Sequence, residues 1–129
     1  MGLFSGKNPT KSLMKHTQQK GYVITNDGTY YRFEIRFEED NLSLFPYFVI
    51  DEDKNIFSIC INLKKVLNDK EINYQKIIDF NNNSRFFTLK FENNVLFLEY
   101  NTYFDDNLEN IFDLIIENVF MLRNLIKNL

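Results

Sequence analysis

The chain has one histidine and one cysteine, the two side chains that most often combine in nucleophilic catalysis. A Cys–His pair would join His16 to Cys60 as base and nucleophile. Cys60 stands in an apolar run between Ile59 and Ile61, where a free cysteine is typically a buried, inert thiol. A single cysteine excludes an internal disulfide and a single histidine excludes a cluster of histidine ligands. We therefore expect Cys60 in the core and His16 on the surface.

Three polar segments resemble binding or catalytic motifs, and each lacks a necessary part. Residues 6–12 end like a phosphate-binding loop, but the second glycine and the preceding strand are missing. Residues 51–55 have the oxygen ligands of a calcium loop without its glycine and distal glutamate, and we interpret them as a hairpin turn. Asp105 and Asp106 could be paired carboxylates, but their place before a predicted helix favours capping. We predict no catalytic residue, no metal and no cofactor, and hence no enzyme.

Several aromatic side chains could in principle stack on nucleic-acid bases: Phe86, Phe87, Tyr100 and Tyr103. Such a platform needs a basic groove, whereas Glu92 and Glu99 lie among these residues. The formal net charge of the chain is −3, with a pI near 5.2. A chain of this charge has no general attraction for phosphate backbones or anionic lipid. We predict that nucleic acid is not a partner and that the aromatic residues serve packing.

The sequence contains no long apolar run. No segment approaches the roughly 18 apolar residues of a membrane span, and the N-terminus lacks the apolar stretch of a signal peptide. We therefore expect a cytoplasmic protein with no membrane partner. Residues 1–8 show no periodicity and are predicted to be a flexible tail, followed by one domain over residues 9–129.

Helices are predicted at three places. Asn8 and Pro9 favour a helix start and Gly21 a helix end, so the first helix covers residues 9–20. Helical spacing of isoleucine predicts a second helix over residues 69–81. Apolar residues recur every three or four positions over residues 107–127, which predicts a long amphipathic helix.

Strands are predicted between these helices. Alternating apolar and charged residues indicate a strand over residues 29–38, which could begin as early as residue 22. Apolar runs over residues 44–50 and 56–63 form a hairpin, with Pro46 favouring an edge or a strand start. Residues 85–92 and 95–103 form a second hairpin across Asn93 and Asn94. The predicted fold is α+β, with an antiparallel sheet of about five strands, helices on one side, the order α-β-β-β-α-β-β-α and a core rich in phenylalanine.

The amount of apolar surface exceeds what one small core needs. It is concentrated in the strand over residues 44–50 and on the outer face of the last helix. An excess of this kind often marks a dimer or partner surface. The predicted partner-binding residues are Leu44, Phe45, Tyr47, Phe48, Ile116, Phe120 and Leu125.

Residues 72–125 resemble the YbjN-like proteins, which share the fold of type III secretion chaperones. In that pattern a helix ends in Asn just before a strand, as Phe80 and Asn81 do here, and two strands, a polar cap and a long terminal helix follow. The N-terminal half is similar in the order of its elements. The resemblance implies a small acidic homodimer that holds an extended segment of a protein client, or a regulator of the kind loosely described for sensory transduction.

The sequence thus predicts a non-enzymatic protein-binding module, chaperone-like or regulatory. One alternative is an immunity or antitoxin-type protein that neutralises one specific partner. A separate acidic face formed by Glu34, Glu38, Glu39 and Asp40 would favour that role. A small-ligand binder or enzyme, and a structural component of an assembly, are the other classes left open.

Overall fold

The computed structural model describes residues 8–66 and 72–124 of the chain. In chain order the elements are α2 (Pro9–Gln19), β1 (Thr25–Asn26), β2 (Tyr31–Arg32), β3 (Ile35–Phe37), the 3-10 turn η1 (Glu38–Asp40), β4 (Leu42–Leu44), β5 (Tyr47–Asp51), β6 (Ile56–Val66), α3 (Tyr74–Asn83), β7 (Thr88–Glu92), β8 (Val95–Tyr103) and α4 (Leu108–Met121). The antiparallel α+β fold predicted from the sequence is confirmed.

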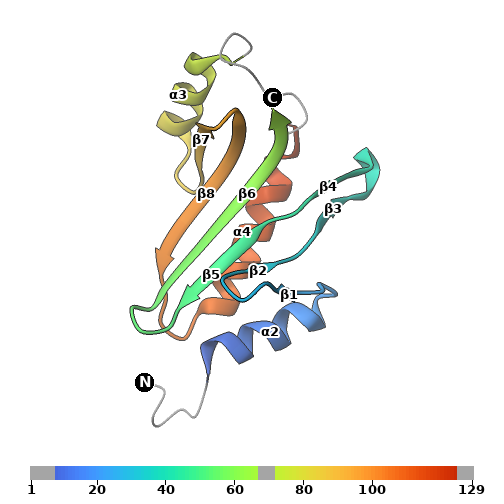
Figure 1. The fold of residues 1–129 in the computed structure, drawn as a ribbon, viewed down its shortest axis with the longest axis vertical. Helices are drawn as coiled ribbons and strands as arrows, with labels where there is room; N and C mark the ends of the chain where they lie inside the picture. Colours follow the sequence, from blue (N-terminus) through green and yellow to red (C-terminus); the bar gives the residue numbers. More distant parts are fainter. Residues whose placement is uncertain (1–7, 67–71, 125–129) are drawn as a thin grey trace.

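One antiparallel sheet organises these elements (Figure 1). Its six strands run in the order β1-β2-β5-β6-β8-β7, and β3 and β4 form a separate pair. β8 lies between β6 and β7, so it joins the N-terminal strands to the C-terminal hairpin. Asn93 and Asn94 both have positive φ, as a two-residue hairpin turn requires, which confirms the predicted turn.

The pair β3–β4 is a bent continuation of β2 and β5. Tyr31 pairs with Phe48 in the main sheet and Ile35 pairs with Leu44 in the small one, so the register passes between them without a shift. Phe33 stands opposite Pro46 at the interruption and donates its N–H to the Pro46 carbonyl at 3.3 Å. Proline has no N–H to return to the ladder. The two long strands predicted over residues 29–38 and 44–50 are therefore each divided at this point.

Helix α2 begins and ends where the sequence predicted. The Asn8 side chain accepts a hydrogen bond from the Lys11 N–H at 3.0 Å, and Pro9 occupies the first turn. Gly21 follows the helix with φ of +92°, a conformation that side chains with a Cβ rarely adopt. The predicted tail over residues 1–8 lies outside the described residues except for Asn8.

The other two helices differ from their predicted bounds. Helix α3 begins at Tyr74, where Asn73 caps it by accepting from the Lys76 N–H, and residues 69–71 of the predicted helix lie outside the described residues. Helix α4 ends at Met121, and residues 125–127 of its predicted range also lie outside them. The sequence Asp105-Asp106-Asn107 was expected to cap α4, and its third residue, Asn107, is the N-cap residue, while Asp105 and Asp106 precede the cap.

The three helices lie on one face of the sheet. Helix α4 crosses behind the sheet in Figure 1 and buries Leu108, Ile111, Phe112, Ile115 and Val119 against it. Its Phe112 ring contacts Phe33, Phe48 and Tyr22, which form an aromatic core of the kind predicted. α2 packs beside α4, and α3 packs beside β7.

Candidate functional site

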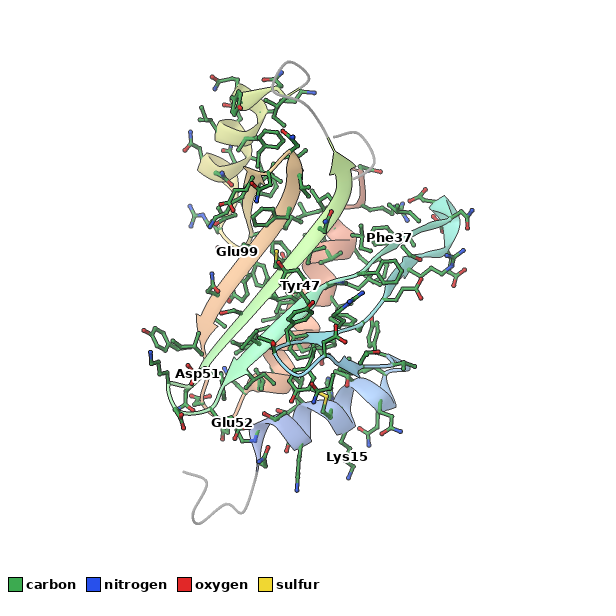
Figure 2. All side chains as sticks on the ribbon, viewed as in Figure 1. Lys15, Phe37, Tyr47, Asp51, Glu52 and Glu99 are labelled. Carbon is green, nitrogen blue, oxygen red and sulfur yellow. The ribbon has the colours of Figure 1, made fainter. Side chains whose placement is uncertain are left out.

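The face of the sheet opposite the helices carries the candidate site. Burial alternates along the strands, so that one set of side chains enters the core and the other points away from it. We call the second set the outer face, which includes Arg32, Phe45, Tyr47, Val49, Ser58, Cys60, Asn62, Thr88, Lys90, Glu92, Phe97, Glu99, Asn101 and Tyr103. Within the described residues no helix covers it, and Tyr47 and Glu99 stand on it in Figure 2.

The outer face exposes large apolar side chains along its length. Phe45, Tyr47 and Val49 are each about 41–42 % exposed, and Tyr103 is 76 % exposed. The Tyr47 ring contacts the Tyr30 ring, with centroids 5.2 Å apart. A sheet surface that only meets water normally alternates polar residues with the buried ones. The aromatic and aliphatic residues here indicate a surface suited to contact with another molecule.

A polar row crosses the middle of this face. Tyr47 pairs with Cys60, and Cys60 pairs with Glu99 on the next strand. Lys90 Nζ lies 2.9 Å from Glu99 Oε1, and this hydrogen-bonded ion pair raises the pKa of Lys90. Arg32 and Glu92 lie on the same face by strand register, so this face carries charges of both signs.

Tyr47 and Cys60 interact directly at the centre of the row. A hydrogen bond between their side chains, aided by burial, raises the pKa of Tyr47 to about 12. Burial raises the pKa of the Cys60 thiol, although the bond to Tyr47 works in the opposite direction. The thiol is therefore protonated at neutral pH and is a weak nucleophile.

The predicted partner-binding residues of the 44–48 segment divide between the two faces. Phe45 and Tyr47 lie on the outer face, as the prediction requires. Leu44 and Phe48 are 0 % exposed in the core, so the structure corrects the prediction at these two positions. The reason is the strand geometry, which sends alternate side chains to opposite sides.

The predicted residues of the last helix lie on the other side of the molecule. Ile116 is half-buried against the core, and Phe120 is exposed but touches Phe37 edge-on at 5.1 Å. Leu125 lies outside the described residues. Ile116 and Phe120 belong to the helix layer, so they do not form one surface with Phe45 and Tyr47.

The structure separates the two residues that could have formed a Cys–His pair. Cys60 is half-exposed on the outer face rather than buried in the core, which corrects the expectation for it. His16 is on α2 in the helix layer, where its Nε2 lies 2.8 Å from Asp113 Oδ1 of α4. His16 is thus half-buried between two helices instead of free on the surface.

Three of the four acidic residues that would favour an immunity-type contact lie beside an arginine, while Glu34 accepts a hydrogen bond from Ser43. Glu38 pairs with Arg36 at 3.6 Å, and Glu39 pairs with Arg123 of α4 at 3.1 Å. Asp40 also lies 3.6 Å from Arg123. The segment is therefore an ion-paired tip of the β3–β4 hairpin that is fastened to the end of α4.

The remaining sequence candidates have structural explanations. Asp51 Oδ1 accepts from the N–H groups of Asp53 and Lys54, which builds the predicted hairpin turn at the lower end of the sheet in Figure 2. Phe86 stacks on Tyr100 with ring centroids 4.1 Å apart. Across residues 8–66 and 72–124 no group of three or more His, Cys, Asp or Glu side chains could hold a metal ion.

Val49 is an exposed member of the outer face that was not singled out from the sequence, and the alternation within residues 44–50 was the signal that could have identified it. Tyr103 was expected to serve packing, and the structure corrects this, because its side chain is 76 % exposed on the outer face. In the described part of the chain, every helix is too short or too polar to cross a bilayer. Comparisons of the chain with protein-family models, with curated proteins and with solved structures gave no match.

Proposed function

We propose that this chain is a non-enzymatic protein-binding module, chaperone-like or regulatory, that acts in the cytoplasm. It forms a homodimer through the outer face of its sheet and binds a protein or peptide partner on the rest of its surface. The observation that carries the proposal is the helix-free sheet face with exposed Phe45, Tyr47, Val49 and Tyr103. A bare face of this composition is stabilised when a second protein covers it.

The charges of the outer face allow a second copy of the same chain to bind there. A two-fold interface places the same patch on both partners, so the patch must be complementary to itself. The outer face carries Lys90 beside Glu99 and exposed apolar groups around them. In a two-fold arrangement the cationic side chains of one copy can meet the carboxylates of the other.

The size of the face also suits a small dimer interface. Four strands spaced about 4.8 Å apart and about 20 to 30 Å long give a projected area of about 500 Å². Small specific interfaces bury about 600 Å² of accessible surface on each partner, and accessible area exceeds the projected one. Face-to-face packing of two sheets at a distance of about 10 Å is a common arrangement.

The resemblance of residues 72–125 to YbjN-like proteins and type III secretion chaperones points in the same direction. Members of that fold group are small acidic dimers that bind protein segments. The separation of Cys60 from His16 on opposite sides of the sheet supports a role without nucleophilic catalysis. Three observations therefore support the proposal: an uncovered sheet face, charges of both signs on that face, and the resemblance of residues 72–125 to a family of protein-binding dimers.

The test uses two matched substitutions. Val49→Lys places a charge on the outer face, and Val23→Lys makes the same change at a position that is 82 % exposed outside it. We expect the wild-type chain and the Val23→Lys variant to show a dimer mass by light scattering at about 200 µM. The Val49→Lys variant should dissociate at least tenfold more readily. At a concentration where all three proteins are monomers, it should unfold at the same urea concentration as the other two.

A pull-down with the tagged chain from the native cell lysate then tests partner binding. We expect a stoichiometric protein partner with both the wild type and the Val23→Lys variant. A monomer at every concentration, together with no recovered partner, would refute the proposed function. Equal dimerisation of the Val49→Lys variant would show that the outer face is not the interface.

A further inference from the structure

The helix side of the molecule contains a groove that is separate from the outer face. It lies between α3 and the C-terminal end of α4 and has a volume of about 790 Å³. Volumes of this size hold ligands or short peptide segments. Its apolar lining consists of Phe80, Phe86, Phe87, Met121 and Leu122.

The walls of the groove are held firmly by neighbouring contacts. The Phe86 ring is stacked on Tyr100 at 4.1 Å and meets Phe87 edge-on at 4.9 Å. Ser84 donates its hydroxyl to the Phe87 carbonyl at 2.7 Å, which fixes the turn between α3 and β7. The groove is therefore a preformed feature of the fold.

Two cationic side chains, Lys76 and Arg85, and one acidic side chain, Asp79, line the same groove. Neither Lys76 nor Arg85 forms an ion pair with a carboxylate among the described residues, and Asp79 accepts a hydrogen bond from Gln75 at 2.8 Å. Two cations against one carboxylate leave the lining with a net positive charge, although the chain carries a net charge of −3. A ligand for this groove needs apolar groups for its lining and negative charge for its rim.

The groove is open along one wall, because Met121 is 73 % exposed. A site for a fatty acid or another small molecule usually surrounds most of the ligand. An open apolar groove between helices is typical of sites that receive the apolar stripe of an amphipathic segment. Exposed methionine also suits such a surface, because its flexible side chain adapts to different apolar groups.

We infer that the α3–α4 groove binds an amphipathic protein segment whose apolar residues are flanked by Asp or Glu. This inference rests on the proposed function as a binding module and names the chemistry of its partner. The apolar side chains of the segment contact Phe80, Phe86 and Met121, and its carboxylates pair with Lys76 and Arg85. The groove and the outer face lie on opposite sides of the sheet, so both can be occupied at once.

The experiment compares two labelled peptides of about 16 residues that share the same leucines at helical spacing. One carries glutamates on its polar face and the other carries lysines. The acidic chain would attract the lysine peptide if binding depended only on overall charge. We expect the glutamate peptide to bind at least tenfold more tightly by fluorescence anisotropy, and less tightly in high salt.

Three variants locate the binding. Met121→Glu should reduce the affinity for the glutamate peptide at least tenfold, and the double change Lys76→Glu with Arg85→Glu should reverse the preference between peptides. The double change Lys11→Glu with Lys15→Glu alters charge by the same amount on α2 and should leave the preference intact. Lys15 lies on α2, on the opposite end of the molecule in Figure 2.

Several outcomes would overturn the inference. These are equal affinity for both peptides, unchanged affinity of the Met121→Glu variant, or saturable binding of dodecanoate without binding of the glutamate peptide. Peptide binding that occurs only after residues 125–129 are removed would assign the groove to the chain's own terminus. Val49→Lys should leave peptide affinity unchanged, so failure of the groove and failure of the outer face are distinguished.

Discussion

Asn81 of α3 completes the hydrogen bonding of Leu89 on the edge strand β7. Its amide nitrogen donates to the Leu89 carbonyl at 2.9 Å, and its carbonyl oxygen accepts from the Leu89 N–H at 2.7 Å. One side chain therefore replaces the neighbouring strand that an edge residue lacks. This arrangement protects the edge from pairing with another chain.

Replacing Asn81 with leucine should destabilise the fold by about 1–3 kcal/mol, because two backbone groups of Leu89 lose their partner. Urea unfolding followed by circular dichroism measures this change. Asn82→Leu is the matched control, since Asn82 is exposed in the same helix. Equal midpoints for the two variants would contradict the role assigned to Asn81.

Phe48→Ala should cost about 3–5 kcal/mol of unfolding free energy, because the ring is fully buried among Phe33, Phe57 and Phe112. Tyr47→Ala removes an aromatic side chain one position away that is 41 % exposed, and its cost should be clearly smaller. Chemical denaturation of the two variants tests the assignment of these residues to opposite faces. A larger loss for Tyr47→Ala would reverse that assignment.

Stability should fall at alkaline pH. Cys60 and Tyr47 both have a raised pKa in the folded state, so the unfolded chain releases their protons first as the pH rises. Their contribution is complete below the ordinary cysteine pKa of 9.0 and is lost between about pH 9 and about pH 12. Urea midpoints at pH 7.5 and pH 10.5 measure the loss.

The double variant Tyr47→Phe with Cys60→Ala removes both groups and serves as the comparison. Its midpoint should decline less between pH 7.5 and pH 10.5 than that of the wild type. An identical decline in both proteins would place the alkaline sensitivity elsewhere. Tyr22 is one example, because burial also raises the pKa of its hydroxyl.

Local sequence patterns predicted most of the fold. The turn at Asn93 and Asn94, the cap at Asn8 and the helix end at Gly21 depend on neighbouring residues only, and the structure confirms each of them. The division of the two long strands opposite Pro46 was not predicted, since it depends on which residue of the partner strand faces the proline.

The candidate site was predicted only in part, for a physical reason. Hydrophobicity identified the segment that contains Phe45 and Tyr47, but it did not distinguish the inward from the outward side chains of an apolar strand. The groove between α3 and α4 was not found, because its lining comes from segments far apart in the sequence. The same is true of the contact between His16 and Asp113.

The central position of β8 has a consequence for the order of folding. The other neighbouring strands of the six-stranded sheet are close to each other in sequence. In contrast, Ile56 of β6 pairs with Tyr103 of β8, and α3 and β7 lie between these two strands in the sequence. Closing that long loop costs chain entropy before the pairing compensates for it. The N-terminal strands and the C-terminal hairpin should therefore form separately and join late. The amide protons that join β6 to β8 should accordingly exchange when these two parts separate, before the amide protons of the β5–β6 and β7–β8 pairs.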